Sequence, residues 1–185
     1  MTSLVVFTIG HSTRTIEDFI RLLKAHRVQR VLDVRTIPRS RHNPQFDRGH
    51  LSPALHRARI HYRHMPGLGG LRRPRRDSTN MGWRNASFRG YADYMQTDTF
   101  REHLDRCIEL ATHERVVLMC AEALPWRCHR SLIADALLVR GIAASEIVSG
   151  IRARPHFLTP WALVTGTGVT YPVAGVHSQQ ARAIA

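Results

Sequence analysis

Apolar and polar positions alternate along the chain in blocks that predict strands separated by helices. The strands are indicated by short apolar runs of strand length, bounded by turn residues, at 4–9, 30–34, 60–65, 115–120 and 147–148. Helical spacing of apolar residues predicts helices that begin at Thr15 and cover 88–95, 98–113 and 131–140, with a short helix starting at Ser52-Pro53. Strands that alternate with helices favour a mostly parallel sheet covered on both faces. We therefore expect an α/β fold, a single Rossmann-like domain with about five strands and an arginine-rich insertion.

The length of 185 residues suits one hydrophobic core and a tail. We place the α/β domain at residues 1–150 and a C-terminal extension at 151–185. Phe157, Trp161 and Tyr171 predict that part of this extension packs on the domain, whereas residues 179–185 are expected to be disordered.

Positive charge is concentrated in one part of the chain. The formal net charge is +13, and residues 35–89 hold thirteen arginines against Asp47 and Asp77 alone. Such a surplus favours polyanions, so we expect DNA, RNA or a phosphorylated small molecule as the partner. A solvated surface loop is the alternative. The arginines expected to contact nucleic acid are Arg39, Arg41, Arg72, Arg73, Arg75 and Arg76.

Reactive side chains follow three of the predicted strands. The first strand ends at His11 and Ser12, the second at Asp33 and Arg35, and the fourth at Cys120 and Glu122. Ligands of open α/β sheets bind outside the carboxyl ends of the strands. If the strands are parallel, one cleft gathers these groups with Arg127, His129 and Arg130.

Three chemistries could use such a cleft. Carboxylate chemistry would use Glu122 and Asp33, with Cys120 and His11 in support, as in cleavage at a sugar carbon. A cysteine nucleophile is opposed by Pro125, which removes an amide from the loop where a phosphate nest would need one. An ion-pair role for both carboxylates is the structural alternative.

No cofactor and no metal is expected from these residues, and zinc at Cys120, Cys128 and His129 is the alternative. Cysteine and histidine are the ligands that zinc prefers. The seven residues between the two cysteines exceed the usual short spacing of zinc knuckles, and the adjacent pair Cys128-His129 favours a structural role.

Substrate contacts are expected from polar, basic and aromatic side chains near the strand ends. Trp126 lies in a loop and is the better aromatic candidate, because Tyr91 and Tyr94 have helical spacing that also suits packing. The expected substrate-binding residues are Ser12, Arg35, Ser40, Tyr91, Trp126, Arg127, His129 and Arg130.

Several ordered motifs carry a family resemblance: Thr8–Ser12, Asp33-Val34-Arg35 with Pro38 and Ser40, Phe88–Met95, and Cys120-Ala121-Glu122 with Pro125 and Cys128-His129-Arg130. Over residues 4–150 the chain resembles the bacterial family called domain of unknown function 488, and residues 158–172 resemble the usual tail of that family. The resemblance implies a compact α/β domain and leaves the reaction open.

We therefore expect an enzyme, of hydrolase type or cleaving a glycosidic bond, that acts on nucleic acid or a nucleotide. A non-catalytic nucleic-acid-binding module and a regulatory domain that binds a small anion are the alternatives. Three scattered cysteines favour a reducing cytoplasm, and no apolar run reaches the roughly 18 residues of a membrane span.

Overall fold

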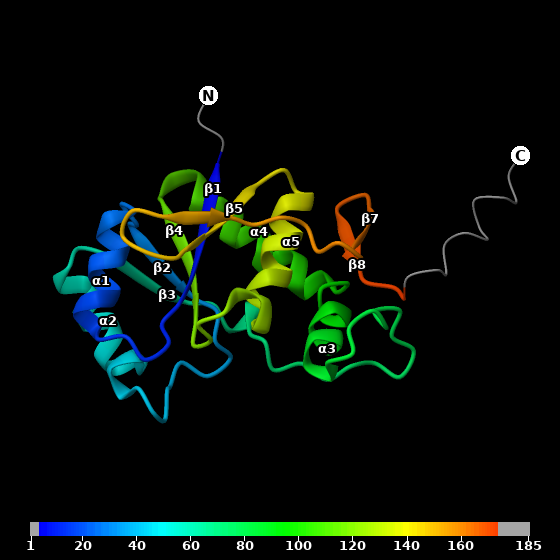
Figure 1. Ribbon diagram of the computed structural model, residues 1–185, viewed down its shortest axis with the longest axis horizontal. Coiled ribbons are helices and arrows are strands. Elements are labelled where there is room, and N and C mark those ends of the chain that lie inside the picture. The colour runs from blue at the N-terminus through cyan, green and yellow to red at the C-terminus, as the bar shows by residue number, and fades with distance from the viewer. Residues whose placement is uncertain (1–3, 174–185) are drawn as a thin grey trace, which may run out of the picture.

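Six strands form one sheet in the order β3-β2-β4-β1-β5-β6 in a computed structural model that describes residues 4–173 (Figure 1). All neighbouring pairs among the first five strands are parallel, and β6 runs antiparallel to β5. This confirms the mostly parallel α/β sheet, with one strand more than expected. The strands are β1 Val5–Gly10, β2 Arg30–Asp33, β3 His61–His64, β4 Val116–Cys120, β5 Ala143–Ile147 and β6 Ala153–Pro155.

Five helices cover the two faces of this sheet. They are α1 Ile16–Ala25, α2 Arg48–Arg57, α3 Ala86–Tyr94, α4 Asp98–His113 and α5 Arg130–Val139. Single 3-10 turns occur at η1 Pro44–Phe46, η2 Pro66–Leu68 and η3 Pro125–Arg127. The expected helix at 98–113 is confirmed at both ends, and Thr15 caps α1 by accepting a hydrogen bond from the Asp18 amide at 3.1 Å.

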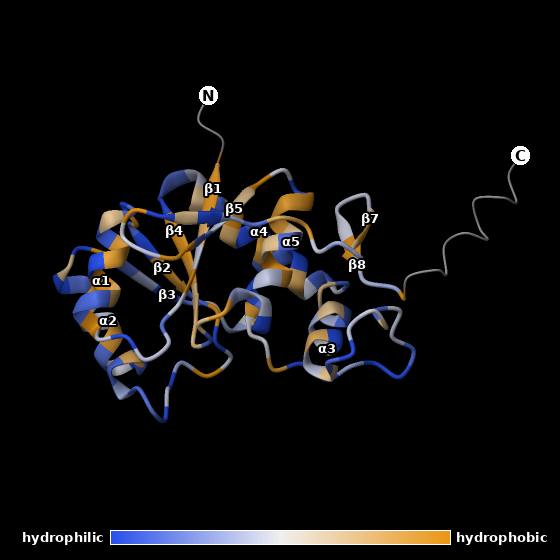
Figure 2. Cartoon of the chain, viewed as in Figure 1, coloured by the Kyte–Doolittle hydropathy of each residue, from blue (hydrophilic) through white to orange (hydrophobic). Residues whose placement is uncertain are grey.

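Successive residues of the central strands enter two separate cores. Val31 packs with Phe19 of α1 on one face of the sheet, while Leu32 packs with Leu104 of α4 on the other. Both faces are therefore buried, which is why the strands are continuously apolar rather than alternating. Figure 2 shows the hydrophobic residues concentrated along β1 and β4 and on the adjoining helices.

The expected start of the second helix at Ser52-Pro53 is wrong. Helix α2 begins at Arg48, and Pro53 lies inside it. The proline lacks an N–H and so removes the hydrogen bond to the carbonyl of Gly49, four residues earlier. Because Gly49 is exposed and near the start of the helix, water can reach this carbonyl, and the helix tolerates the proline.

Part of the C-terminal extension packs against α5. Its hairpin, β7 Leu163–Thr165 and β8 Gly168–Thr170, was not expected from the sequence. Tyr171 is fully buried, and its hydroxyl donates to Asp135 Oδ2 at 2.8 Å. Residues 179–185, expected to be disordered, lie outside the described residues. No helix within 4–173 combines the length and the apolar character that a membrane crossing requires.

Candidate functional site

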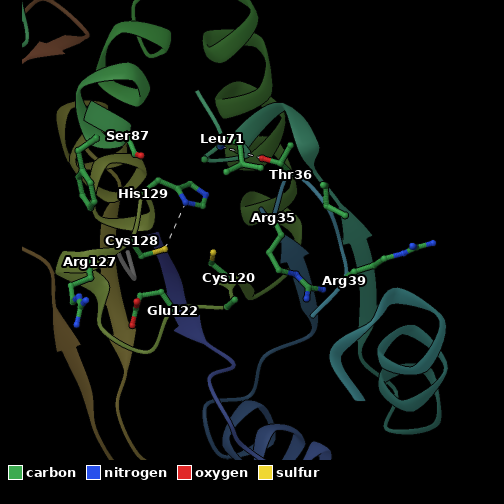
Figure 3. A pocket seen from close by; sticks show the side chains of 14 residues that line it. Arg35, Thr36, Arg39, Leu71, Ser87, Cys120, Glu122, Arg127, Cys128 and His129 are labelled. Atoms are coloured by element: carbon green, nitrogen blue, oxygen red, sulfur yellow. Dashed lines mark hydrogen bonds between the residues drawn. The ribbon is translucent and has the colours of Figure 1, made fainter. Parts of the chain in front are cut away.

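A cavity of about 360 Å³ opens beyond the carboxyl ends of β2 and β4 (Figure 3). It is lined by residues from four separate parts of the chain, among them Arg35, Arg39, Glu122, Arg127, Cys128 and His129. Parallel strands point their ends to one edge of the sheet, so this is the place where the topology predicts a ligand. We call it the strand-end cavity.

Close packing of two strand ends fixes the position of Glu122. A Cβ on Gly10 would lie 1.9 Å from the Glu122 carbonyl oxygen, so glycine is required where β1 ends. The His11 amide donates to the Cys120 carbonyl at 2.9 Å, and the Ser12 amide donates to the Ala121 carbonyl at 3.0 Å. The loop after β4 is therefore attached to the loop after β1.

Glu122 supplies a carboxylate to the strand-end cavity. Its Oε1 accepts a hydrogen bond from the Leu124 amide at 3.1 Å, and its side chain is half-buried. Among the residues of 4–173 that line this cavity, it is the one with a carboxylate. Glu122 thus lies where the sequence predicts a chemical group.

Asp33 lies below the cavity rather than in it. Its side chain is 0% exposed and accepts hydrogen bonds from Arg35 Nε at 2.8 Å, Arg35 Nη2 at 2.6 Å and the Tyr62 hydroxyl at 2.7 Å. Burial, with the neighbouring Asp33 charge, raises the pKa of Tyr62, so this hydroxyl stays protonated and donates. Asp33 therefore forms the ion pair that was the structural alternative, and Arg35 is held by it.

His11 is buried with 1% of its surface exposed. Its ring stacks on Phe46 with centroids 4.2 Å apart, and Nδ1 lies 2.8 Å from the Ser12 carbonyl oxygen. Burial lowers the pKa of His11 to about 4, so the imidazole is neutral at physiological pH. His11 packs behind the strand-end cavity, and Ser12 adopts a left-handed φ of 51° in the turn beside it.

Two thiols and an imidazole converge on one wall of the cavity. The Sγ atoms of Cys120 and Cys128 and a ring nitrogen of His129 all lie within 4.8 Å of one another. Hydrogen bonding between the thiols lowers the pKa of Cys128 and raises that of Cys120, and the charge of Arg130 adds to the lowering of the Cys128 pKa. The pair therefore favours a thiolate on Cys128 and a proton on Cys120.

Arg130 holds this wall together from beneath. It is fully buried, and its nitrogens donate to Cys128 Sγ at 3.4 Å, to Glu122 O at 2.6 Å and to Glu146 Oε1 at 3.3 Å. A guanidinium with these partners is not available to a substrate phosphate, contrary to expectation. It instead positions Cys128 and Glu122.

Some arginines of the arginine-rich region form contacts within the protein, and others are exposed to solvent. Arg72 lies over the Tyr94 ring at 3.6 Å and donates to the Gly69 carbonyl at 3.1 Å, and Arg75 pairs with Asp77 at 2.8 Å. Four arginines of the region that were expected to bind nucleic acid are exposed and can contact a polyanion: Arg39, Arg41, Arg73 and Arg76. The Ser40 amide donates to Asp47 Oδ1 at 2.6 Å, which turns this segment back towards α2.

The aromatic candidates separate clearly. Tyr91 is fully buried, and its hydroxyl donates to the Leu68 carbonyl at 2.9 Å, so it is a core residue rather than a substrate contact. Trp126 is 59% exposed and lines a second cavity of about 520 Å³ together with Trp83, Phe157 and Trp161. We call this the aromatic cavity.

A family model described as "Domain of unknown function DUF488" matches residues 15–137, from the cap of α1 to α5. The chain belongs to this family. Neither a curated protein nor a solved structure matches it.

The DUF488 domain contributes cavity residues that sequence reasoning missed. Thr36, Leu71, Ser87 and Phe88 line the strand-end cavity, and Gly70 lies against the His129 ring. The glycine pair at 69–70 was the available signal, since adjacent glycines mark close approach of the backbone to another group. Trp161 packs against Trp83, as expected, with ring centroids 5.1 Å apart, whereas Phe157 is 80% exposed. Both residues line the aromatic cavity.

Proposed function

We propose that this DUF488 protein is an enzyme that binds a nucleotide, free or within a nucleic acid, and cleaves it by hydrolysis or at the glycosidic bond. The observation that carries the proposal is the position of the turn η3 between two cavities. Its Arg127 lines the strand-end cavity, and the preceding Trp126 lines the aromatic cavity. A nucleotide has a charged end and an aromatic end, and these adjacent residues match both.

The strand-end cavity suits the phosphate. Arg39 and Arg127 line it with exposed guanidiniums, and neither forms an ion pair within 4–173. Guanidinium groups bind phosphate oxygens bidentately, and a cavity wall reduces their screening by solvent.

The aromatic cavity suits the base. Trp126, Phe157 and Trp161 all present exposed ring surface there, and bases stack on such rings. Its volume of about 520 Å³ falls within the range of small-molecule sites. Arg154 and His156 line the same cavity and supply polar groups for the edges of a base.

We assign the catalytic role to the carboxylate of Glu122. Glycosidases commonly use two carboxylates, but Asp33 is sealed by Arg35 and Tyr62, so the second expected carboxylate does not reach the cavity. Glu122 would act alone, as a general base towards water or as a negative charge that stabilises an oxocarbenium-like carbon. Cys120 supports it by forming the adjacent wall.

Calorimetric titration with a nucleoside monophosphate, the matching nucleoside and ribose phosphate tests the two-ended site. Arg127→Ala should weaken binding of the monophosphate and ribose phosphate, and Trp126→Ala should weaken binding of the monophosphate and nucleoside by about 5-fold or more. Arg106→Ala, at an exposed position of α4, is the matched control. If Arg127→Ala and Trp126→Ala bound the monophosphate as tightly as the Arg106→Ala control, the proposal would be contradicted.

Glu122→Gln separates an enzyme from a binding module. It should abolish release of base or phosphate, measured by chromatography, while the monophosphate affinity stays within about 3-fold of the parent. Unchanged turnover would remove Glu122 from the mechanism. Binding without turnover in the parent protein would instead support the alternative of a non-catalytic module, which the exposed Arg73 and Arg76 favour.

We include a cytoplasmic location in the proposal, because the three cysteines are free, as is usual in a reducing compartment.

A further inference from the structure

The wall formed by Cys120, Cys128 and His129 has the geometry of a metal site. The three residues come from the end of β4, the residue after η3 and the residue before α5. Seven residues separate the cysteines in sequence, yet η3 turns the chain back so that Cys128 lies beside Cys120. Figure 3 shows the two sulfur atoms and the imidazole turned towards one another at the edge of the cavity.

The separations match a tetrahedral zinc ion. Zinc bonds of about 2.3 Å to sulfur and 2.1 Å to nitrogen, at tetrahedral angles, place the two ligand atoms about 3.6 Å apart. Cys128 Sγ and His129 Nδ1 are 3.7 Å apart, and all three ligand atoms lie within 4.8 Å of one another. An ion can therefore enter with small side-chain adjustments.

His129 is oriented as a ligand by its second nitrogen. Nε2 lies 3.1 Å from the Val34 carbonyl oxygen, which can only accept, so Nε2 carries the proton and Nδ1 presents its lone pair to the thiols. Zinc-binding histidines are characteristically held by such a hydrogen bond. Gly70 lies against the ring at its Nδ1 end and restricts its movement, because a Cβ there would lie 2.4 Å from Nδ1.

The charges around the site are also compatible with zinc. Two thiolates neutralise a divalent cation, and Arg130 Nε donates a hydrogen bond to Cys128 Sγ at 3.4 Å while Glu146 balances the guanidinium. A neutral cluster with its sulfur hydrogen-bonded costs little to bury. Hydrogen bonds to the sulfur also favour the thiolate as ligand.

We propose that Cys120, Cys128 and His129 bind one zinc ion, with the fourth coordination position facing the strand-end cavity. Three protein ligands and an open position characterise catalytic rather than structural zinc. A water molecule or a substrate oxygen would occupy this position, in the cavity that also holds Glu122. The inference does not depend on the nucleotide proposal, since an ion can bind whatever the substrate.

Metal binding to the full chain tests the site directly. Protein reduced with a phosphine and freed of metal with a chelator is titrated with Zn²⁺ in competition with a chromophoric chelator, and elemental analysis gives the stoichiometry. We expect one equivalent per chain, and Co²⁺ should give the intense sulfur-to-cobalt absorption of a tetrahedral thiolate site. Failure of the parent protein to bind either ion stoichiometrically would overturn the proposal.

Ligand variants identify the residues. Cys120→Ala, Cys128→Ala and His129→Ala should each weaken zinc affinity by at least about 100-fold, since even an outer-shell partner accounts for 10- to 100-fold. Cys107→Ala, on the buried face of α4, is the matched control and should bind as the parent does. Parent-like affinity in both ligand-cysteine variants would refute the assignment. Circular dichroism verifies folding, and the cobalt spectrum of the parent stands independently of any variant.

The outcome is separable from that of the proposed function. Loss of zinc in the Cys128→Ala variant with intact nucleotide binding would support the metal site and leave the two-ended nucleotide site standing. Stoichiometric zinc in a parent protein that binds no nucleotide would support the metal site and contradict the nucleotide proposal.

Discussion

Asp33 and Arg35 form a buried, two-bonded ion pair at the end of β2, with nitrogen-to-oxygen distances of 2.8 and 2.6 Å. Their side chains are 0% and 5% exposed. Arg35 still lines the strand-end cavity, so the pair holds a guanidinium in a fixed position at its floor. From the sequence, an acidic residue at the end of a strand indicates a catalytic role. In the structure, Asp33 instead holds Arg35 in position.

Breaking this pair should be costly. Asp33→Asn leaves a buried guanidinium without its counter-charge, so we expect the free energy of unfolding to fall by about 3–5 kcal/mol, measured by urea denaturation. Asp77→Asn, at the exposed pair with Arg75, is the control, and we expect no measurable change there. A loss as small as that of the control would show that Arg35 does not depend on Asp33.

A methyl group on Gly70 should disturb the cavity wall. The Cβ of Gly70→Ala would meet the His129 ring at 2.4 Å, so we expect about 1–3 kcal/mol of destabilisation, measured by thermal and urea unfolding. The control is Gly49→Ala in α2, where a Cβ meets nothing within 4 Å. That substitution should stabilise the protein by about 0.5–1 kcal/mol through helix propensity. Similar effects of both substitutions would contradict the close contact at His129.

Acid should weaken the ion pair between Glu114, at the end of α4, and Arg30, at the start of β2. Two hydrogen bonds from Arg30, at 2.8 and 2.9 Å, and one from His61 lower the pKa of Glu114 below its usual value near 4.3. Because the pKa of Glu114 is lower in the folded than in the unfolded protein, its ionised carboxylate stabilises the fold at any pH above the unfolded-state pKa. This contribution is lost as the pH falls through the folded-state pKa. We therefore expect the parent to lose up to about 1 kcal/mol more than Glu114→Gln between pH 6 and 3.

Urea denaturation of the parent and of Glu114→Gln at several pH values measures this difference. Parallel stability curves for the two proteins across that window would show that Glu114 titrates alike in the folded and unfolded states.

Polyanion binding should depend on salt through a subset of the arginines. On single-stranded DNA, removing one arginine that contacts a phosphate reduces the slope of log affinity against log salt by about 0.7, so Arg73→Ala combined with Arg76→Ala should lower it by about 1.4. Fluorescence anisotropy at several salt concentrations measures the slope. Arg21→Ala with Arg101→Ala, on exposed helix surfaces, is the control. A slope near zero in the parent would exclude the polyanion partner.

The C-terminal segment should contribute to stability through Tyr171. Tyr171→Phe removes the hydroxyl that donates to buried Asp135 at 2.8 Å, and we expect a loss of about 1–3 kcal/mol in urea denaturation. Thr170→Val in β8 is the control, because this half-buried side chain forms no hydrogen bond within the described residues. No loss on Tyr171→Phe would mean that Thr159 and His156 satisfy Asp135 without the tyrosine.

The sequence by itself determined the first four strands, most of the helices and the edge of the sheet where the cavity lies, whereas β6 and the hairpin of β7 and β8 were not predicted. These features depend on neighbouring residues: apolar runs form buried strands, Thr15 caps the helix that follows it, and parallel strands end at one edge. The sequence also placed Glu122 at that edge, because β4 ends two residues earlier.

Only the tertiary structure decided which of the strand-end groups reach the cavity. Asp33 is sealed by Tyr62 of β3, His11 is covered by Phe46, and Cys128 returns to Cys120 through η3. Each outcome depends on a contact between residues far apart in the chain, or on the path of an irregular turn. Local periodicity carries no information on such contacts, because burial and charge pairing are set by whatever packs against a side chain.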